Sequence, residues 1–131
     1  MGTENNERCP EEFIVDMNKI IETLKEHPDY AKMGMIASHL GVVRGASLNG
    51  KKVTGIEVVF DQDAIDRIVR DTRERDGIFE VVVNTSSGPL KVGEEIMAVV
   101  VGGDIRDHVF PALMTAVNRI KAEASTKKEF F

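Results

Sequence analysis

Five basic residues carry the chemistry that this sequence suggests: Arg44, Arg106, Lys121, Lys127 and Lys128. A guanidinium group is planar and can hold a phosphate or a carboxylate through two parallel hydrogen bonds. A lysine that lies close to other cations gives up its proton more readily, and can then transfer protons or stabilise an oxyanion. Gathered in one pocket, these side chains would suit a negatively charged substrate.

Each of these residues also has a simpler explanation when it is taken alone. Arg44 ends a predicted strand, where a charge is ordinarily solvated. Lys121 lies in the last turn of a predicted helix, where the helix dipole favours a cation. Arg106 lies in the first turn of that helix, where the dipole opposes a cation, and such a misplaced charge is a hint of function. The tail with Lys127 and Lys128 either stays a solvated end or folds back to place a second ammonium beside Lys121.

The other residue types that commonly do chemistry form no recognisable set. The three histidines, His27, His39 and His108, are not spaced like metal ligands. His39 lies in an apolar segment, which indicates a core histidine with satisfied hydrogen bonds. The single cysteine, Cys9, excludes a disulfide framework and a zinc site built from several thiolates. We therefore predict no metal site and no bound cofactor.

Composition limits the expected partners. The net charge of −5 argues against a nucleic-acid-binding protein, although it remains compatible with a local basic pocket. The sequence has no apolar run of the about 18 residues that cross a membrane, and no secretory leader. We expect a cytoplasmic protein without membrane or nucleic-acid partners. It would have a disordered segment at 1–9 and a single domain at 10–131.

Hydrophobic periodicity predicts the elements that would position the basic residues. We expect a helix from Pro10 to His27-Pro28, followed by a strand at 33–43. Asn49-Gly50 is a strong hairpin signal, and 53–60 is the expected return strand. A second predicted helix is capped by Asp61 or Asp63 and closed at Asp76-Gly77. Strands at 78–83 and 96–101 follow, joined at 84–95 by a loop or a bulged hairpin connection, and Gly102-Gly103 is expected to break the second strand. The final helix is capped by Asp104 or Asp107 and has Pro111 in its first turn, and its expected buried stripe consists of Phe110, Leu113, Met114, Val117 and Ile120.

These elements predict an α+β domain. Their order is helix, two strands, helix, two strands, helix, and consecutive strands joined by short connections pair antiparallel. The helices must then cover one face of an antiparallel sheet.

Four segments, in the right order, resemble the MoaE family, the large subunit of molybdopterin synthase. In GMIASHLGVVRG at 34–45, the family spacing is kept by Gly34, Gly41, Val43 and Arg44, while Met35 and His39 replace the usual Ala and Phe. The other three are GPLKVGEE at 88–95, IRDHVFPA at 105–112 with Arg106, Phe110 and Ala112 retained, and NRIKAEASTKKE at 118–129, which resembles the lysine-containing family ending.

The resemblance implies an α/β-hammerhead-like fold and a role in molybdenum cofactor biosynthesis. In that family, a small ubiquitin-like partner carries sulfur as a thiocarboxylate on its C-terminal Gly-Gly. The large subunit transfers two sulfurs to cyclic pyranopterin monophosphate and makes molybdopterin, and two large subunits form the central homodimer of a heterotetramer. The resemblance further implies that Arg44 and Arg106 bind substrate and that Lys121 is catalytic together with Lys128 or Lys127. Lys128 keeps the family's seven-residue separation from Lys121.

The sequence also departs from the family pattern. Thr85-Ser86 stand where the family has His-Arg, Ile105 stands where it has a second histidine, and the tryptophan before the lysine pair is missing. Three hypotheses follow. The first, which we favour, is a sulfur-transferring subunit. The second is a non-catalytic homodimeric relative that binds an anion or a pterin. The third is an unrelated α+β protein, in which Arg44, Arg106 and Lys121 would not converge.

Overall fold

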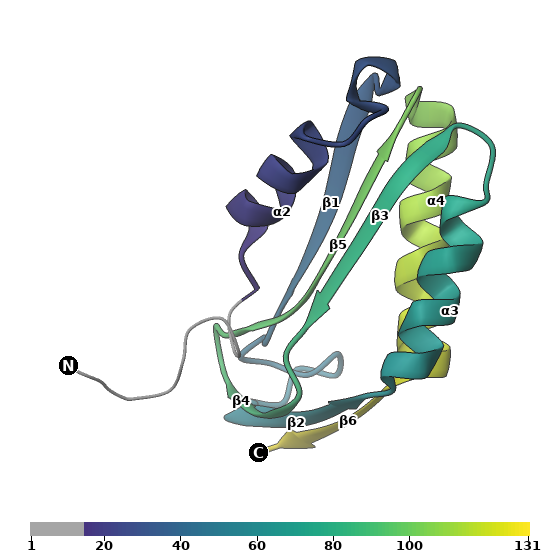
Figure 1. Ribbon diagram of the computed structural model, residues 1–131. Helices are drawn as coiled ribbons and strands as arrows, with labels where there is room; N and C mark the ends of the chain where they lie inside the picture. Colours follow the sequence, from purple (N-terminus) through teal and green to yellow (C-terminus); the bar gives the residue numbers. More distant parts are fainter. Residues whose placement is uncertain (1–14) are drawn as a thin grey trace.

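The computed structural model describes residues 15–131, and these form two antiparallel three-stranded sheets with helices packed on the larger one (Figure 1). The predicted α+β class is confirmed, but the strands divide between two sheets where one was expected. The segment at 1–9 and the start of the helix predicted from Pro10 lie outside the described residues.

The larger sheet has its most apolar strand in the centre. In spatial order its strands are β1 (Met35–Val42), β5 (Glu95–Gly103) and β3 (Ile78–Thr85), all antiparallel. Along β5, Met97, Val99 and Val101 belong to one buried cluster, and the alternate residues Ala98 and Val100 belong to another. Because β5 buries side chains on both faces, other elements must pack against both faces of the sheet.

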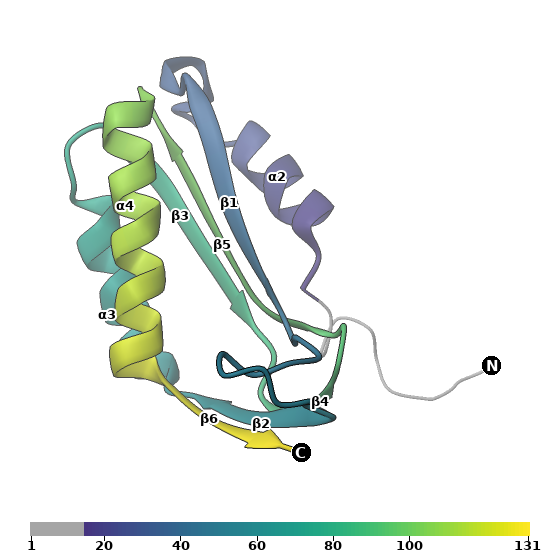
Figure 2. The same ribbon diagram turned by 180° about the vertical axis from the view of Figure 1, so that it is seen from behind.

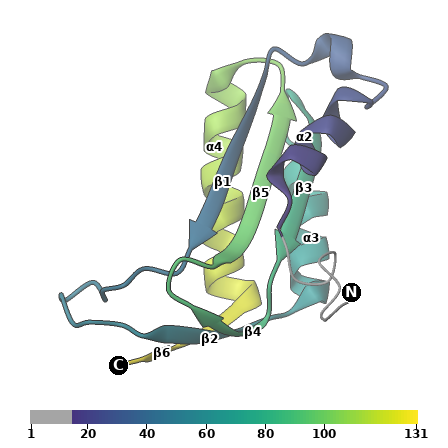
Figure 3. The same ribbon diagram turned by 90° about the vertical axis from the view of Figure 1, so that its left-hand side faces the viewer.

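Helices therefore lie on both faces of this sheet, and the expectation that they cover one face is wrong. The helices are α2 (Met17–Lys25), α3 (Gln62–Arg73) and α4 (Arg106–Arg119). Figure 3 shows α2 on the side opposite α3 and α4. Leu24 of α2 packs in the cluster with Val100, whereas Ile68 of α3 and Val109 of α4 pack in the cluster with Val99.

The first described helix begins later than predicted. Asp16 has extended backbone angles and is the N-cap, because its side chain accepts a hydrogen bond from the backbone N–H of Lys19 at 3.1 Å. No single helix therefore runs from Pro10 to His27. After α2 the chain makes one short 3₁₀ turn, η1 (Tyr30–Lys32), and enters β1.

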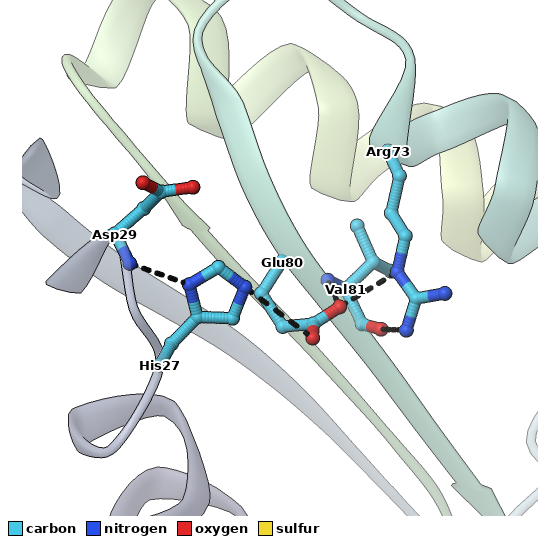
Figure 4. A network of polar contacts seen from close by, with 5 residues as sticks. All are labelled: His27, Asp29, Arg73, Glu80 and Val81. Atoms are coloured by element: carbon cyan, nitrogen blue, oxygen red, sulfur yellow. Dashed lines mark hydrogen bonds and ion pairs between the residues drawn. The ribbon is translucent and has the colours of Figure 1, made fainter.

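A polar network fastens the end of α2 to the edge strand β3 and to α3 (Figure 4). Nε of Arg73 and the backbone N–H of Val81 donate to the same Glu80 carboxylate oxygen at 2.6 and 2.8 Å. Nε2 of His27 lies 3.8 Å from the other oxygen of Glu80. Nδ1 of His27 accepts from the backbone N–H of Asp29 at 3.0 Å, so the ring proton resides on Nε2, which faces the carboxylate. The network joins the end of α2 on one face of the larger sheet to α3 on the other face, across the β3 edge.

The smaller sheet crosses one end of the larger sheet, as Figure 1 shows. Its strands are, in spatial order, β4 (Gly88–Lys91), β2 (Gly55–Phe60) and β6 (Ser125–Phe130). The predicted hairpin between 33–43 and 53–60 is wrong, because β1 pairs with β5 and β2 pairs with β4 and β6. Asn49-Gly50 does form a tight turn with Gly50 at φ +87°, but that turn closes only a small loop with one bridge between Ala46 and Lys52.

The two strands that sequence patterns missed are the edges of this smaller sheet. β4 lies within the predicted loop 84–95, and β6 is the predicted tail. Both are short and carry lysines, which are common on edge strands and weaken the hydrophobic pattern that reveals a strand. The tail therefore folds back against β2, and the alternative of a solvated end is wrong.

Small residues let α4 pack closely against the larger sheet. The buried residues of α4 are Val109, Ala112, Ala116 and Val117, whereas Phe110 and Met114 of the predicted stripe are 53% and 66% exposed. Gly102-Gly103 continue β5 and do not break it as predicted. A Cβ on Gly103 would lie 2.6 Å from a methyl carbon of Val109, so this glycine sets the distance between strand and helix.

The start of α4 also differs from its prediction. Ile105 is the N-cap residue and caps without a side-chain hydrogen bond. Asp104, one residue earlier, accepts from the Ile105 backbone N–H at 2.6 Å and pairs with Nδ1 of His108 at 2.8 Å. The hydrogen bond from His108 holds the pKa of the Asp104 carboxyl below its usual value. Pro111 is the sixth residue of the helix, beyond the first turn, so the helix forgoes one backbone hydrogen bond there.

Candidate functional site

A cavity of about 590 Å³ lies where β1 ends, α4 ends and the smaller sheet crosses beneath them. Figure 2 shows the lower end of α4 running into β6. The wall contributed by β2 is apolar and consists of Ile56, Val58 and Phe60. The cavity is thus an apolar cleft with its polar groups concentrated on β1, β6 and the end of α4.

Three of the five predicted basic residues line this cavity: Arg44, Lys121 and Lys127. They come from positions far apart in the sequence and are brought together only by the pairing of β2 with β6 and the packing of α4 on the larger sheet. Glu129 is the acidic side chain among the described lining residues. Positive charge therefore exceeds negative charge in the cavity, although the whole chain is acidic.

Lys121 is held at the cavity by an unusual helix end. α4 passes directly into a π-helical turn, η2 (Ile120–Ala124), which leads into β6 without a loop. The backbone N–H of Asp61 donates to the Ala124 carbonyl at 2.8 Å, and the Ser125 hydroxyl donates to the Lys121 carbonyl at 3.3 Å. Because this backbone is fixed by β2 and β6, the Lys121 side chain emerges from a rigid position. π-helical turns are frequent at functional sites.

The carboxylates of Glu123 and Asp71 bind Arg119 and not Lys121. Arg119 donates to Glu123 at 2.9 and 3.1 Å and to Asp71 of α3 at 2.9 Å. These hydrogen bonds raise the pKa of Arg119 and lower the pKa of the Glu123 carboxyl. Within residues 15–131, Lys121 forms no ion pair, so its charge remains available to a bound anion.

The alternation of side chains along β6 separates the two neighbouring lysines. Lys127 lies opposite Val58 in the β2–β6 ladder and lines the cavity, as Val58 does. Lys128 lies opposite Glu57 on the other face of the sheet, and its ammonium sits 5.7 Å from the centre of the Phe130 ring. Lys128, which keeps the seven-residue separation from Lys121, thus points away from the cavity.

Arg106 does not lie in this cavity. It borders a separate, shallow depression with Gly34, Met35 and Asp107 at the opposite end of α4. Arg106 and Lys121 are fifteen residues apart on one continuous helical segment, which corresponds to about 22 Å along the helix axis. Within one chain, Arg106 and the three cavity cations cannot contact the same small molecule.

His39 is a lining residue that the sequence interpretation assigned to the core. It lies on the same face of β1 as Ala37, which packs against the α4 side of the sheet. Its Nε2 atom is closed to solvent and has no hydrogen-bond partner among the described residues. Burial and the positive charge of Lys121 lower the pKa of the imidazole. The expected satisfied core histidine is therefore wrong, and no sequence signal other than the departure from a family phenylalanine marked it.

In residues 15–131, no group of three or more His, Cys, Asp or Glu side chains is arranged to hold a metal ion. None of the helices in that range is long and apolar enough to cross a membrane.

Comparisons with known proteins identify relatives of this chain. The family model described as MoaE protein matches residues 12–123. An uncharacterized protein of Methanocaldococcus jannaschii is 27% identical over 115 residues, which cover 85% of this chain and 92% of that protein. Molybdopterin synthase from Staphylococcus aureus has a similar structure, with a TM-score of 0.74 and 20% identity, covering 89% of this chain and 85% of that chain.

A further structural relative is a complex of subunits 1 and 2 of the molybdopterin-converting factor from Helicobacter pylori. Its TM-score is 0.67 with 14% identity, covering 92% of this chain and 86% of that chain. The match of the family model spans most of the sequence, and the folds of these solved structures agree with it. This chain is a member of the MoaE protein family.

Proposed function

We propose that this protein is the large subunit of a molybdopterin synthase, which transfers sulfur from a thiocarboxylated partner to cyclic pyranopterin monophosphate. The observation that carries the proposal is the convergence of Arg44, Lys121 and Lys127 in one cavity. Membership of the MoaE family and structural similarity to a molybdopterin synthase support it. The family result also argues against an unrelated α+β protein.

The charges and the walls of the cavity suit this substrate. The precursor carries an anionic phosphate, which a guanidinium such as that of Arg44 binds through two parallel hydrogen bonds. The apolar side chains of Ile56, Val58 and Phe60 offer a surface for a flat ring system. The Lys121 ammonium can stabilise the oxyanion that forms when the acyl carbon of the thiocarboxylate is attacked, because that charge develops close to a fixed cation.

The proposal includes a small partner and a second copy of this chain. The Helicobacter pylori complex pairs two subunits of the molybdopterin-converting factor, and we infer a small ubiquitin-like partner with a C-terminal Gly-Gly here. Because Arg106 is about 22 Å from Lys121 along the helix, it can serve the same cavity only from a second copy. A homodimer within a heterotetramer would therefore complete the predicted set of basic residues.

Reconstitution tests the proposed function directly. The purified chain is mixed with each candidate small partner from its own genome, loaded as the thiocarboxylate, and with the cyclic precursor, and the dithiolene product is measured. We expect product that depends on both additions. If every partner yields none while the cyclic precursor still binds in calorimetry, the protein is the non-catalytic pterin-binding relative. That alternative is favoured by Ile105 and Thr85-Ser86, which replace histidines and an arginine of the family pattern.

Mixing two inactive variants tests the role assigned to the second copy. Arg106→Ala and Lys121→Ala should each abolish most product formation, since each removes one part of every cavity. After unfolding and refolding together, half of the dimers are mixed and carry one intact cavity of two. Recovery of about a quarter of the wild-type activity is then expected. Absence of any recovery, with mixed dimers confirmed by mass spectrometry, would show that Arg106 does not act in the cavity of the other copy.

A further inference from the structure

His39 is a polar residue of the cavity that the proposed function does not yet use. It faces Val99 of β5 across the ladder, and its Nε2 lies over Gly41, where an added Cβ would be 3.6 Å away. A buried polar atom without a partner costs free energy, so such an atom in a native structure calls for an explanation. The phenylalanine usual in the MoaE pattern would fill this position without that cost.

The surroundings of this imidazole disfavour its charged form. It shares the cavity with Lys121 of the π-helical turn, with Lys127 and Glu129 of β6, and with Arg44, which follows β1. The wall from β2 and the neighbouring residues of β5 that line the cavity are apolar. Burial and the Lys121 charge both disfavour the imidazolium form and lower the pKa of His39. A neutral imidazole is a proton acceptor, and the three basic residues beside it carry no free lone pair while they are protonated.

The proposed sulfur transfer needs such an acceptor. The sulfur begins on the acyl carbon of the partner and ends on the pterin. In an intermediate where the sulfur is bonded to both molecules, the bond between the acyl carbon and the sulfur must therefore be cleaved. Water supplies the oxygen that converts the acyl group to a carboxylate. The attacking water must lose a proton as its oxygen–carbon bond forms, and general base catalysis accelerates such a step by about 10²–10⁴-fold.

We propose that His39 is the acid–base residue of this cavity, an inference that rests on the proposed function. Its imidazole takes one proton from the attacking water while the oxygen–carbon bond forms. The tetrahedral oxyanion, stabilised by Lys121, collapses with cleavage of the carbon–sulfur bond, and the electron pair leaves with the pterin-bound sulfur. The imidazolium returns its proton to that thiolate or to solvent, and the new carboxylic acid loses its remaining proton to solvent. No oxidant or reductant takes part.

The ring must turn before Nε2 can meet a guest, because this atom is closed to solvent in the present position. The χ2 torsion of histidine is broad and roughly two-fold, so a half-turn about the Cβ–Cγ bond exchanges which edge of the ring carries Nε2. Gly41 provides no side chain to obstruct that turn. A bound substrate or water would then supply the hydrogen-bond partner that Nε2 lacks.

The test compares His39→Gln and His39→Phe with the wild-type protein in the reconstituted reaction. Glutamine keeps a hydrogen-bonding group but cannot accept a proton, and phenylalanine restores the residue usual in the family. Both variants should form product about 100-fold more slowly. The covalent adduct of partner and pterin should accumulate and be detected by mass spectrometry. The acidic limb of the wild-type pH–rate profile should be absent in His39→Gln.

Two controls separate a catalytic role from a structural one. His27→Gln changes a histidine of the polar network outside the cavity and should retain wild-type activity and pH dependence. His39→Phe should melt at least as high as the wild-type protein, since it removes an unpartnered polar atom. Wild-type rates, no adduct and an unchanged pH profile in His39→Gln would overturn the inference while leaving the proposed function intact. A wild-type protein without product would instead reject the proposed function itself.

Discussion

Lys121→Ala is expected to lower the rate of product formation by about 100-fold or more, with little change in melting temperature. Loss of one positively charged or hydrogen-bonding group that stabilises an oxyanion costs about 10²–10³ in rate, and loss of an acid–base group costs about 10²–10⁴. Lys121 is exposed and forms no ion pair within residues 15–131, so its removal should change the free energy of unfolding only slightly. Single-turnover kinetics and thermal melts on the same preparation provide the measurement.

A neighbouring cation of the same helical segment serves as the control for Lys121. Arg119 engages Glu123 and Asp71 and does not line the cavity. Arg119→Ala should therefore lower the melting temperature while leaving the chemical step near its wild-type rate. If Lys121→Ala unfolded the protein and Arg119→Ala did not, Lys121 would be a structural residue and the oxyanion role would be lost.

Lys127→Ala and Lys128→Ala are expected to differ sharply although the residues are adjacent. Lys127 faces the cavity, and its removal takes away a cation that can contact the anionic substrate, so we expect about a 10–100-fold loss of kcat/KM. Lys128 faces the other side of the smaller sheet, near Phe130, and its removal should change kcat/KM by less than about twofold.

The pair of variants is its own matched control. The substitutions remove the same side chain from successive positions of one edge strand, so the loss of strand propensity and of net charge is the same. Equal losses of activity in the two variants would indicate a general electrostatic effect. A larger loss for Lys128→Ala would show that the separation from Lys121 along the sequence, and not the face of β6, selects the functional lysine.

The sequence alone was sufficient for the helices α3 and α4, for β1, β2, β3 and β5, and for the α+β class. These elements contain apolar runs or apolar repeats that a short window of sequence reveals. The exact buried face was less well predicted, since Phe110 and Met114 of the expected α4 stripe are exposed. Family motifs also indicated Arg44, Lys121 and the 127–128 pair as candidate site residues. These predictions depend on residues close together in the sequence, where spacing alone is informative.

Only the tertiary structure decided which strands pair and which side chains meet. Asn49-Gly50 indicated a hairpin, yet β1 pairs with β5, because a strand buried on both faces by long-range packing outweighs one local turn. The choice between Lys127 and Lys128 depends on the register of β6 against β2, 69 residues away for the Val58–Lys127 pair. His39 was assigned to the core because its own segment is apolar, and only the approach of Lys121 from the other end of the chain made it part of a charged cavity. A linear sequence records periodicity, whereas the convergence of distant charges depends on strand pairing, which no short window of residues contains.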